Sequence, residues 1–193
     1  MTTNSTNSRN VTSVIAQTRR WLKNIILRHN FCPFGHEPAK KESIRYAVCE
    51  STNPDEVAEM FMDELVNLRD GDHNKIETTL FITPNCFADF NDYNEFLDIV
   101  DAMLEQLNLV GIIQIASFHP DYQFADLQVN DARNFTNRSL HPTFHLILED
   151  SIERARTSHP DVESIPQTNM DLLEKQGLEE SKRQLENCRE EQS

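Results

Sequence analysis

The segment from residue 119 to 143 carries the side chains best suited to chemistry in this sequence. It reads HPDYQFADLQVNDARNFTNRSLHPT and has neither helical nor strand periodicity. His119 titrates near neutral pH and can move a proton, with Asp121 or Asp126 to orient it. Arg138 offers a planar guanidinium that suits a carboxylate or a phosphate. A structureless loop of this length in a compact domain is usually functional.

Two predicted strands, residues 110 to 118 and 144 to 149, must position these side chains. If the strands pair antiparallel, the end of the first lies beside the start of the second. The side chains that would then meet at one sheet edge are His119, Asp121, His141 and His145, with Asn134, Asn137 and Arg138 arching over them. If the strands run parallel, these groups lie at opposite ends of the sheet and form no site.

The first functional hypothesis is a small-molecule enzyme that acts by hydrolysis or group transfer on an anionic substrate. His119 and Asp121 would be its catalytic groups. The residues expected to bind the ligand are Arg138, Asn134, Asn137, Tyr122 and Gln114. With only four glycines, the chain has no dinucleotide-binding G-x-G-x-x-G, no P-loop and no G-x-S-x-G elbow, so no organic cofactor is expected.

Three alternatives stay open for the same residues. His119, His141 and His145 with one carboxylate would suit zinc or ferrous iron in a non-catalytic binding module. In a purely structural role, His119 would cap a strand, His145 would be a core histidine, and Arg138 would bridge loop carbonyls. The acidic C-terminal helix could also contact another protein chain.

Cys32, in NFCPFGH, is a second reactive candidate. A nucleophilic thiol needs a lowered pKa, and a position after the C-terminus of the first helix works against this. His36 or His119 could compensate, and Cys32 with His36 could also bind a metal ion. A buried structural cysteine is the alternative.

Composition limits the partners and the compartment. The net charge of −14 disfavours nucleic acid and anionic membrane surfaces, although a local basic pocket is compatible with it. Four scattered cysteines without a C-x-x-C pair, no apolar stretch of membrane-spanning length and a polar start predict a cytoplasmic protein with reduced thiols.

The order of the predicted elements indicates an α+β or α/β fold, with a sheet of about four strands covered by helices. We expect a disordered N-terminus at residues 1 to 10, a single globular domain at 11 to 177, and a polar tail or frayed helix at 178 to 193. Asn53-Pro54-Asp55-Glu56 predicts a helix start, and Gly177 predicts a break in the last helix.

Four sequence motifs together resemble a bacterial family, domain of unknown function 1415. The motif residues are Cys32-Pro33-Phe34; Gly111, Gln114, Ala116, Phe118, His119, Pro120, Tyr122 and Phe124; Asn134, Asn137, Arg138, Ser139, Pro142, His145 and Leu146; and His159, Pro160, Asp161, Glu163, Ile165 and Pro166. The similarity covers about residues 21 to 177. Leu140-His141 departs from the Pro-Tyr of the family pattern and Leu148 from its Arg, which favours His119, His145 and Arg138 over His141. The resemblance implies a cytosolic, bacterial-type protein and supplies no activity.

Overall fold

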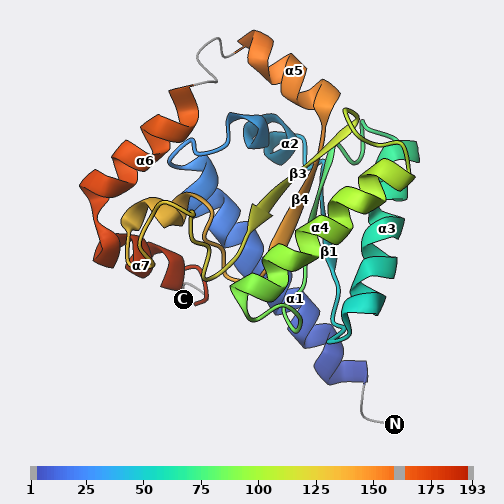
Figure 1. Ribbon diagram of the computed structural model, residues 1–193, viewed down its shortest axis with the longest axis horizontal. Helices are drawn as coiled ribbons and strands as arrows, with labels where there is room; N and C mark the ends of the chain where they lie inside the picture. Colours follow the sequence, from blue (N-terminus) through green and yellow to red (C-terminus); the bar gives the residue numbers. More distant parts are fainter. Residues whose placement is uncertain (1–3, 159–163, 191–193) are drawn as a thin grey trace.

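A four-stranded sheet with helices on both faces forms the centre of the protein in a computed structural model that describes residues 4–158 and 164–190 (Figure 1). The strands are β1 (Ile44–Val48), β2 (Thr78–Ile82), β3 (Ile113–Phe118) and β4 (Thr143–Leu148). All four are rich in β-branched and aromatic residues, which pack well on a pleated surface. The strand order is β1-β2-β4-β3; β1 and β2 are parallel, and the other two pairs are antiparallel. The predicted α+β class is confirmed.

Helices fill the connections between the strands. In chain order they are α1 (Asn4–Trp21), the π-helix η1 (Leu22–Leu27), the 3-10 helix η2 (Pro33–Gly35), α2 (His36–Lys40), α3 (Pro54–Asp70), α4 (Phe90–Gln106), the 3-10 helix η3 (Ala132–Thr136), α5 (Glu149–Ser158), α6 (Ile165–Gln176) and α7 (Leu178–Glu186). Asn53 caps α3 as predicted, because its side chain accepts a hydrogen bond from the Asp55 N–H at 3.0 Å. Gly177, with φ +82°, separates α6 from α7 at the predicted break.

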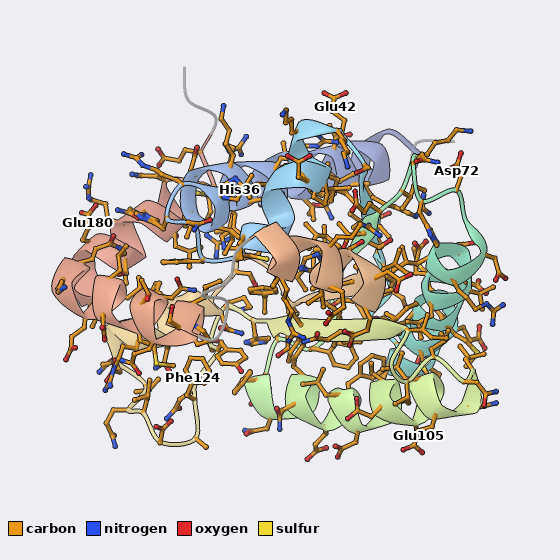
Figure 2. All side chains as sticks on the ribbon, turned by 90° about the horizontal axis from the view of Figure 1, so that it is seen from above. His36, Glu42, Asp72, Glu105, Phe124 and Glu180 are labelled. Carbon is orange, nitrogen blue, oxygen red and sulfur yellow. The ribbon has the colours of Figure 1, made fainter. Side chains whose placement is uncertain are left out.

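Each face of the sheet has its own hydrophobic core, because strand side chains alternate between the faces. Phe81 and Phe144 lie on one face and pack against α3 and α4. Leu80 and Ile82 lie on the other face and pack against α1, η1 and α6. Figure 2 shows α4 on one side of β3 and α1 on the opposite side. The second face carries the cavity described below.

The described residues at both ends of the chain are more helical than the sequence indicates. Residues 1 to 10 are predicted to be disordered, whereas α1 begins at Asn4. Residues 178 to 193 are predicted as a polar tail or frayed helix, whereas Cys188 is only 1% exposed and packs into the core that α1 and η1 form. Arg20 donates from Nε to the Cys188 carbonyl at 2.9 Å. Leu178 and Leu185 of α7, together with the following Cys188, form an apolar stripe that packs against this core, which explains the docking.

No helix within residues 4–158 and 164–190 combines the length and the apolar character needed to cross a membrane.

Candidate functional site

The long connection between β3 and β4 is anchored as the antiparallel prediction requires. Phe118 at the end of β3 pairs with Thr143 at the start of β4. The segment between them therefore leaves the sheet and returns to it at the same edge. At the base of this loop, the backbone N–H of His119 donates a hydrogen bond to the Asn137 carbonyl at 3.1 Å.

His119 is fully buried at the base of this loop, with 0% of its surface exposed. Its Nδ1 accepts a hydrogen bond from the Asp121 N–H at 3.0 Å, and its Nε2 lies 2.9 Å from the Phe87 carbonyl. A carbonyl only accepts, so Nε2 carries the proton and the ring is neutral. Burial lowers the pKa of His119, although the Phe87 carbonyl opposes that shift. Both ring nitrogens of His119 are thus hydrogen-bonded to backbone groups, and the contribution of Asp121 is its backbone N–H.

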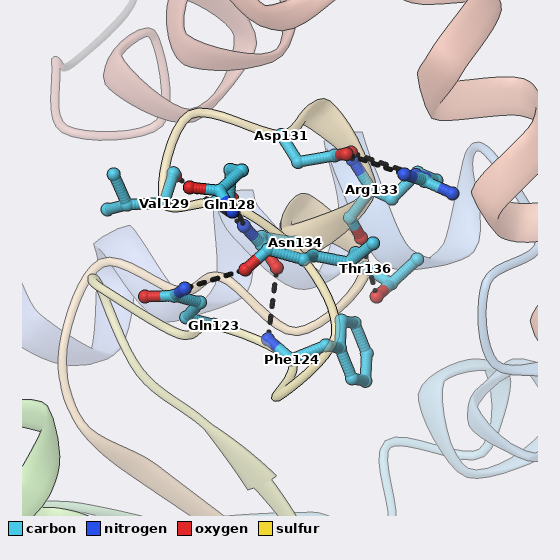
Figure 3. Close-up of polar contacts among 9 residues, drawn as sticks. Gln123, Phe124, Gln128, Val129, Asp131, Arg133, Asn134 and Thr136 are labelled. Carbon is cyan, nitrogen blue, oxygen red and sulfur yellow. Dashed lines mark hydrogen bonds and ion pairs between the residues drawn. The ribbon is translucent and has the colours of Figure 1, made fainter.

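Asn134 and Arg138 brace the loop from within. Asn134 is 0% exposed; its Oδ1 accepts from the Phe124 N–H at 3.1 Å and its Nδ2 donates to the Gln128 carbonyl at 2.8 Å (Figure 3). Arg138 donates from Nη2 to the Val129 carbonyl at 2.8 Å and from Nε to the Tyr122 carbonyl at 3.2 Å. Burial lowers the pKa of Arg138. These contacts match the structural alternative, in which Arg138 bridges loop carbonyls.

The remaining loop candidates divide between the loop interior and a cavity. The Tyr122 ring contacts the rings of Phe90 and Phe124, with centroids 5.2 and 5.0 Å away. Asn137 donates from Nδ2 to the Ser117 carbonyl at 3.1 Å, and its side chain also lines the cavity. Tyr122 is therefore a packing residue here, and Asn137 is the loop side chain best placed to meet a ligand.

The three histidines proposed as metal ligands have separate partners. His141 donates from Nε2 to Oε1 of Gln17 at 2.8 Å, and burial lowers its pKa to about 4. His119 has no free nitrogen, and His145 faces the cavity. Among residues 4–158 and 164–190, no three His, Cys, Asp or Glu side chains are grouped to hold a metal ion. The three-histidine metal site is not assembled in this arrangement.

A cavity of about 360 Å³ lies on the second face of the sheet, bounded by the Cys32-Pro33-Phe34 segment, β3, β4 and α6. The polar side chains that line it are Cys32, Gln114, Thr136, Asn137, His145 and Asn169, and the apolar ones include Phe31, Phe34, Ala116, Phe118, Phe124, Ile147, Ile165 and Met170. No Lys, Arg, Asp or Glu is among the described residues of its wall. The cavity therefore suits a mostly apolar molecule with a few hydrogen-bonding groups.

His145 presents a neutral imidazole to this cavity. The Thr78 hydroxyl donates its proton to the Leu146 carbonyl at 2.6 Å and lies 2.8 Å from Nε2 of His145. The hydroxyl can therefore only accept from His145, which places the proton on Nε2 and a lone pair on Nδ1. In the part of the chain that the structure describes, Nδ1 has no hydrogen-bond partner. His145 is 9% exposed, and burial lowers its pKa to about 4.

Cys32 lines the same cavity, immediately before η2. The sequence predicts an unfavourable position at the end of the first helix, but Cys32 has extended backbone angles and precedes a new helical turn. The backbone N–H groups of Phe34 and Gly35 consequently lower the pKa of the thiol, while burial raises it by more, so the net shift is upward. The raised pKa of Cys32 favours the neutral thiol over the thiolate.

Two features of the cavity were not evident from the sequence. Asn169 of α6 is 8% exposed, donates from Nδ2 to the Phe31 carbonyl at 2.9 Å and lines the cavity. The π-helix η1, which places Ile26 in the wall, also gave no recognisable signal. Single π-helical turns occur frequently at functional sites. The amphipathic pattern of α6 was the only available indication that Asn169 faces inward.

The segments on which the family resemblance rests supply most of the cavity wall. They contribute Cys32-Pro33-Phe34, then Gln114, Ala116, Phe118 and Phe124, then Asn137 and His145, and finally Ile165 and Pro166. The motif residues His159, Pro160, Asp161 and Glu163 lie outside the described residues. Segments far apart in the sequence thus meet around one cavity.

Comparison with curated proteins and with solved structures gave no significant match. Comparison with protein families gave one over residues 13–183, which is most of the chain. The chain therefore belongs to the family described as protein of unknown function (DUF1415).

Proposed function

We propose that this protein binds a small, largely uncharged organic molecule in the cavity between the Cys32 segment, β3, β4 and α6. The observation that carries the proposal is the cavity itself, about 360 Å³ with apolar walls and a few convergent polar groups. Its volume lies at the lower end of the range of small-molecule pockets, roughly 300 to 1,000 Å³. Gln114 and Asn137 would bind the polar groups of the ligand, and Nδ1 of His145 would accept a hydrogen bond from it.

This proposal changes the ligand chemistry expected from the sequence. An anionic ligand in the cavity would not meet Arg138 or Asn134, because both side chains donate to loop carbonyls and neither lines the cavity. It would also lie against a wall without a cationic side chain in the described residues. An uncharged ligand needs no charged partner.

Filling the cavity tests the proposal. Ala116 lines the cavity from β3, so Ala116→Phe should occupy part of its volume without removing a hydrogen bond of the loop. We expect the uncharged dye Nile red to bind the wild type with one-to-one stoichiometry in a fluorescence titration. Ala116→Phe should weaken this binding by about ten-fold, equal to about 1.4 kcal/mol.

Ala116→Ser is the matched control, because it alters the same position while leaving the cavity open. It should bind the dye within about two-fold of the wild type. Equal dye affinity in Ala116→Phe and Ala116→Ser, with both variants folded by circular dichroism, would place the ligand elsewhere and contradict the proposal.

A second candidate function is thiol-dependent acyl transfer or hydrolysis in the same cavity. It is favoured by one observation, namely that a thiol residue, Cys32, and an imidazole residue, His145, both line the cavity. Sγ of Cys32 would attack the acyl carbon of an ester as its proton passes to Nδ1 of His145. The imidazolium would then protonate the departing alcohol, and water would hydrolyse the thioester. The raised pKa of Cys32 and the lowered pKa of His145 oppose ionisation of the pair, so binding is the first proposal.

Thiol labelling measures the accessibility and ionisation of Cys32. The other three cysteines are buried, with exposed fractions of 4% for Cys49, 8% for Cys86 and 1% for Cys188. We expect N-ethylmaleimide to add one equivalent per native chain, at Cys32, as measured by peptide mass spectrometry. Because burial raises the thiol pKa, the rate should still be rising between pH 7 and 9. Cys32→Ser should abolish the adduct; rapid labelling with a rate already level at pH 7 would instead indicate a thiolate and favour catalysis.

A divalent metal in this cavity is a weaker proposal. Cys32 and His145 line it together, but zinc and iron sites take three or four protein ligands. We also propose a cytoplasmic location, in keeping with the four free cysteines.

A further inference from the structure

Three neighbouring basic side chains on this acidic protein have no acidic partner among the described residues and line the same surface hollow. In the part of the chain that the structure describes, Arg19, Lys23 and Lys40 form no salt bridge, although the net charge is −14. Other cations pair closely: Arg45 lies 2.7 Å from Glu64, and Arg133 lies 2.6 Å from Asp131. What sets the three apart from other described cations without a salt bridge, such as Arg28 and Lys175, is that they line one hollow.

The three cations line one surface hollow of about 420 Å³, enclosed by α1, η1, α2 and the start of β1. Arg19 and Lys23 lie about one helical turn apart, so their side chains project to the same side. Lys40 ends α2 and reaches the hollow from across it. Leu27 and Ile44 give the hollow apolar walls. No residue lines both this hollow and the cavity of Cys32 and His145, so the two sites are distinct.

Tyr46 holds one of these cations in place. The Arg19 guanidinium lies over the Tyr46 ring, with Cζ 4.4 Å from the ring centroid. Stacking uses the face of the guanidinium and leaves its N–H groups at the edge for an oxyanion. The Tyr46 hydroxyl has no hydrogen-bond partner among the described residues, which adds a neutral donor to the hollow.

The described wall of the hollow carries little negative charge to balance its three cations. Glu42 is the one carboxylate among the described residues of its wall. His36, the first residue of α2, also lines the hollow, and its Nε2 donates to Oδ1 of Asn30 at 3.0 Å. Lys41, which follows α2 directly, is already paired with Glu37 and Glu77, with its Nζ 3.9 and 3.8 Å from their carboxylates. The hollow therefore has an excess of positive charge that an anion would neutralise.

We propose that this hollow is a binding site for a small organic anion carrying phosphate or carboxylate groups. The charged groups lie between Arg19, Lys23 and Lys40, and the uncharged part packs on Tyr46 and Leu27. A long polyanion is disfavoured, because the rest of the surface is strongly acidic and repels it. This site is independent of the proposed function, and it moves the anionic ligand expected from the sequence away from Arg138.

Calorimetric titration with inorganic pyrophosphate, and separately with citrate, tests the site. We expect saturable one-to-one binding of at least one of them to the full-length protein. The double variant Lys23→Ala/Lys40→Ala should weaken it by at least about ten-fold, since two charge-assisted contacts are lost. Both lysines are exposed, so the variant should fold as the wild type does. Added sodium chloride should weaken binding, because exposed charges are screened.

The matched control is Lys75→Ala/Lys175→Ala, which removes the same charge from exposed positions outside the hollow. Its affinity should stay within about two-fold of the wild type. Tighter binding of pyrophosphate supports a phosphorylated ligand, and tighter binding of citrate supports a polycarboxylate. The proposal is overturned if neither anion binds saturably at concentrations up to about 10 mM, or if both double variants bind as the wild type does.

Discussion

The His119→Ala variant is expected to lose about 3 to 5 kcal/mol of unfolding free energy, a large part of the stability of a typical domain. The substitution removes an imidazole that is 0% exposed and packs between the rings of Phe90 and Tyr93, with centroids 5.2 and 5.1 Å away. It also leaves the Phe87 carbonyl and the Asp121 N–H without their partner. Chemical denaturation followed by circular dichroism measures the loss.

The hydrogen bond from His119 to Phe87 also stabilises a strained backbone turn. Phe87 has a φ of +59°, a left-handed conformation that bulky residues adopt only when the surroundings impose it. Nε2 of His119 donates to the carbonyl of this residue and so stabilises the strained turn. Without the imidazole, the turn before α4 should relax, and the base of the long loop should loosen with it.

Two conservative variants separate the two hydrogen bonds. His119→Asn retains an acceptor near the position of Nδ1, and His119→Gln retains a donor near the position of Nε2. Each should be destabilised less than His119→Ala. His73→Ala is the control: His73 is an exposed histidine whose Nε2 also donates to a carbonyl, that of Leu68, at 2.9 Å. A His119→Ala protein as stable as His73→Ala, but without ligand binding, would show that His119 is a functional residue after all.

Part of the fold and of the candidate site could be predicted from the sequence, as His119 and His145 illustrate. The four strands and the cap at Asn53 followed from local patterns, because alternation, β-branched residues and capping residues act over short distances. The relative direction of the last two strands was left open by the sequence, and the structure shows that they are antiparallel. The antiparallel pairing also places Ala116 opposite His145, on one face of the sheet. For the antiparallel alternative, the sequence pattern was therefore sufficient to place both residues on one face of the sheet, and His145 was among the predicted site residues.

The roles of Asn134 and Arg138 were not decided by the sequence. A long loop buries backbone carbonyls and N–H groups that need partners, and an Asn or Arg serves this need as well as it serves a ligand. Only the folded positions of Gln128 and Val129 show that their carbonyls take these donors. Likewise, Cys32 reaches the cavity through the packing of η1 and α6, which depends on contacts between residues distant in the sequence.

Acid should destabilise the protein between about pH 6.5 and 4, before most carboxylates are protonated. An unfolded histidine has a pKa of about 6.5, whereas burial lowers the pKa of His145 to about 4 and that of His141 to about 4. The unfolded chain therefore binds more protons in this range, so the unfolding free energy is fully present above pH 6.5 and falls as the pH falls. His119, whose pKa is also lowered, acts in the same direction.

The size of the effect can be assigned to a single side chain. For His145, 9% exposed, the loss between pH 7 and pH 4.5 is on the order of 2 to 3 kcal/mol. His141 is more exposed and should contribute less. His145→Gln retains a donor for the Thr78 hydroxyl but does not titrate, so its unfolding free energy should fall by about 2 kcal/mol less than that of the wild type over this range.

Urea unfolding of the wild type, His145→Gln and His73→Gln at pH 7.0, 5.5 and 4.5 measures these differences. His73→Gln controls for the removal of an exposed histidine. If His145→Gln loses stability toward pH 4.5 as steeply as the wild type, the imidazole is not held neutral against the cavity. In that case the pKa of His145 in the folded protein would lie near the ordinary value of about 6.5, so the imidazole would become charged below that pH and the cavity could then take an anionic ligand. The same titration thus connects the stability of the protein to the chemistry of its cavity.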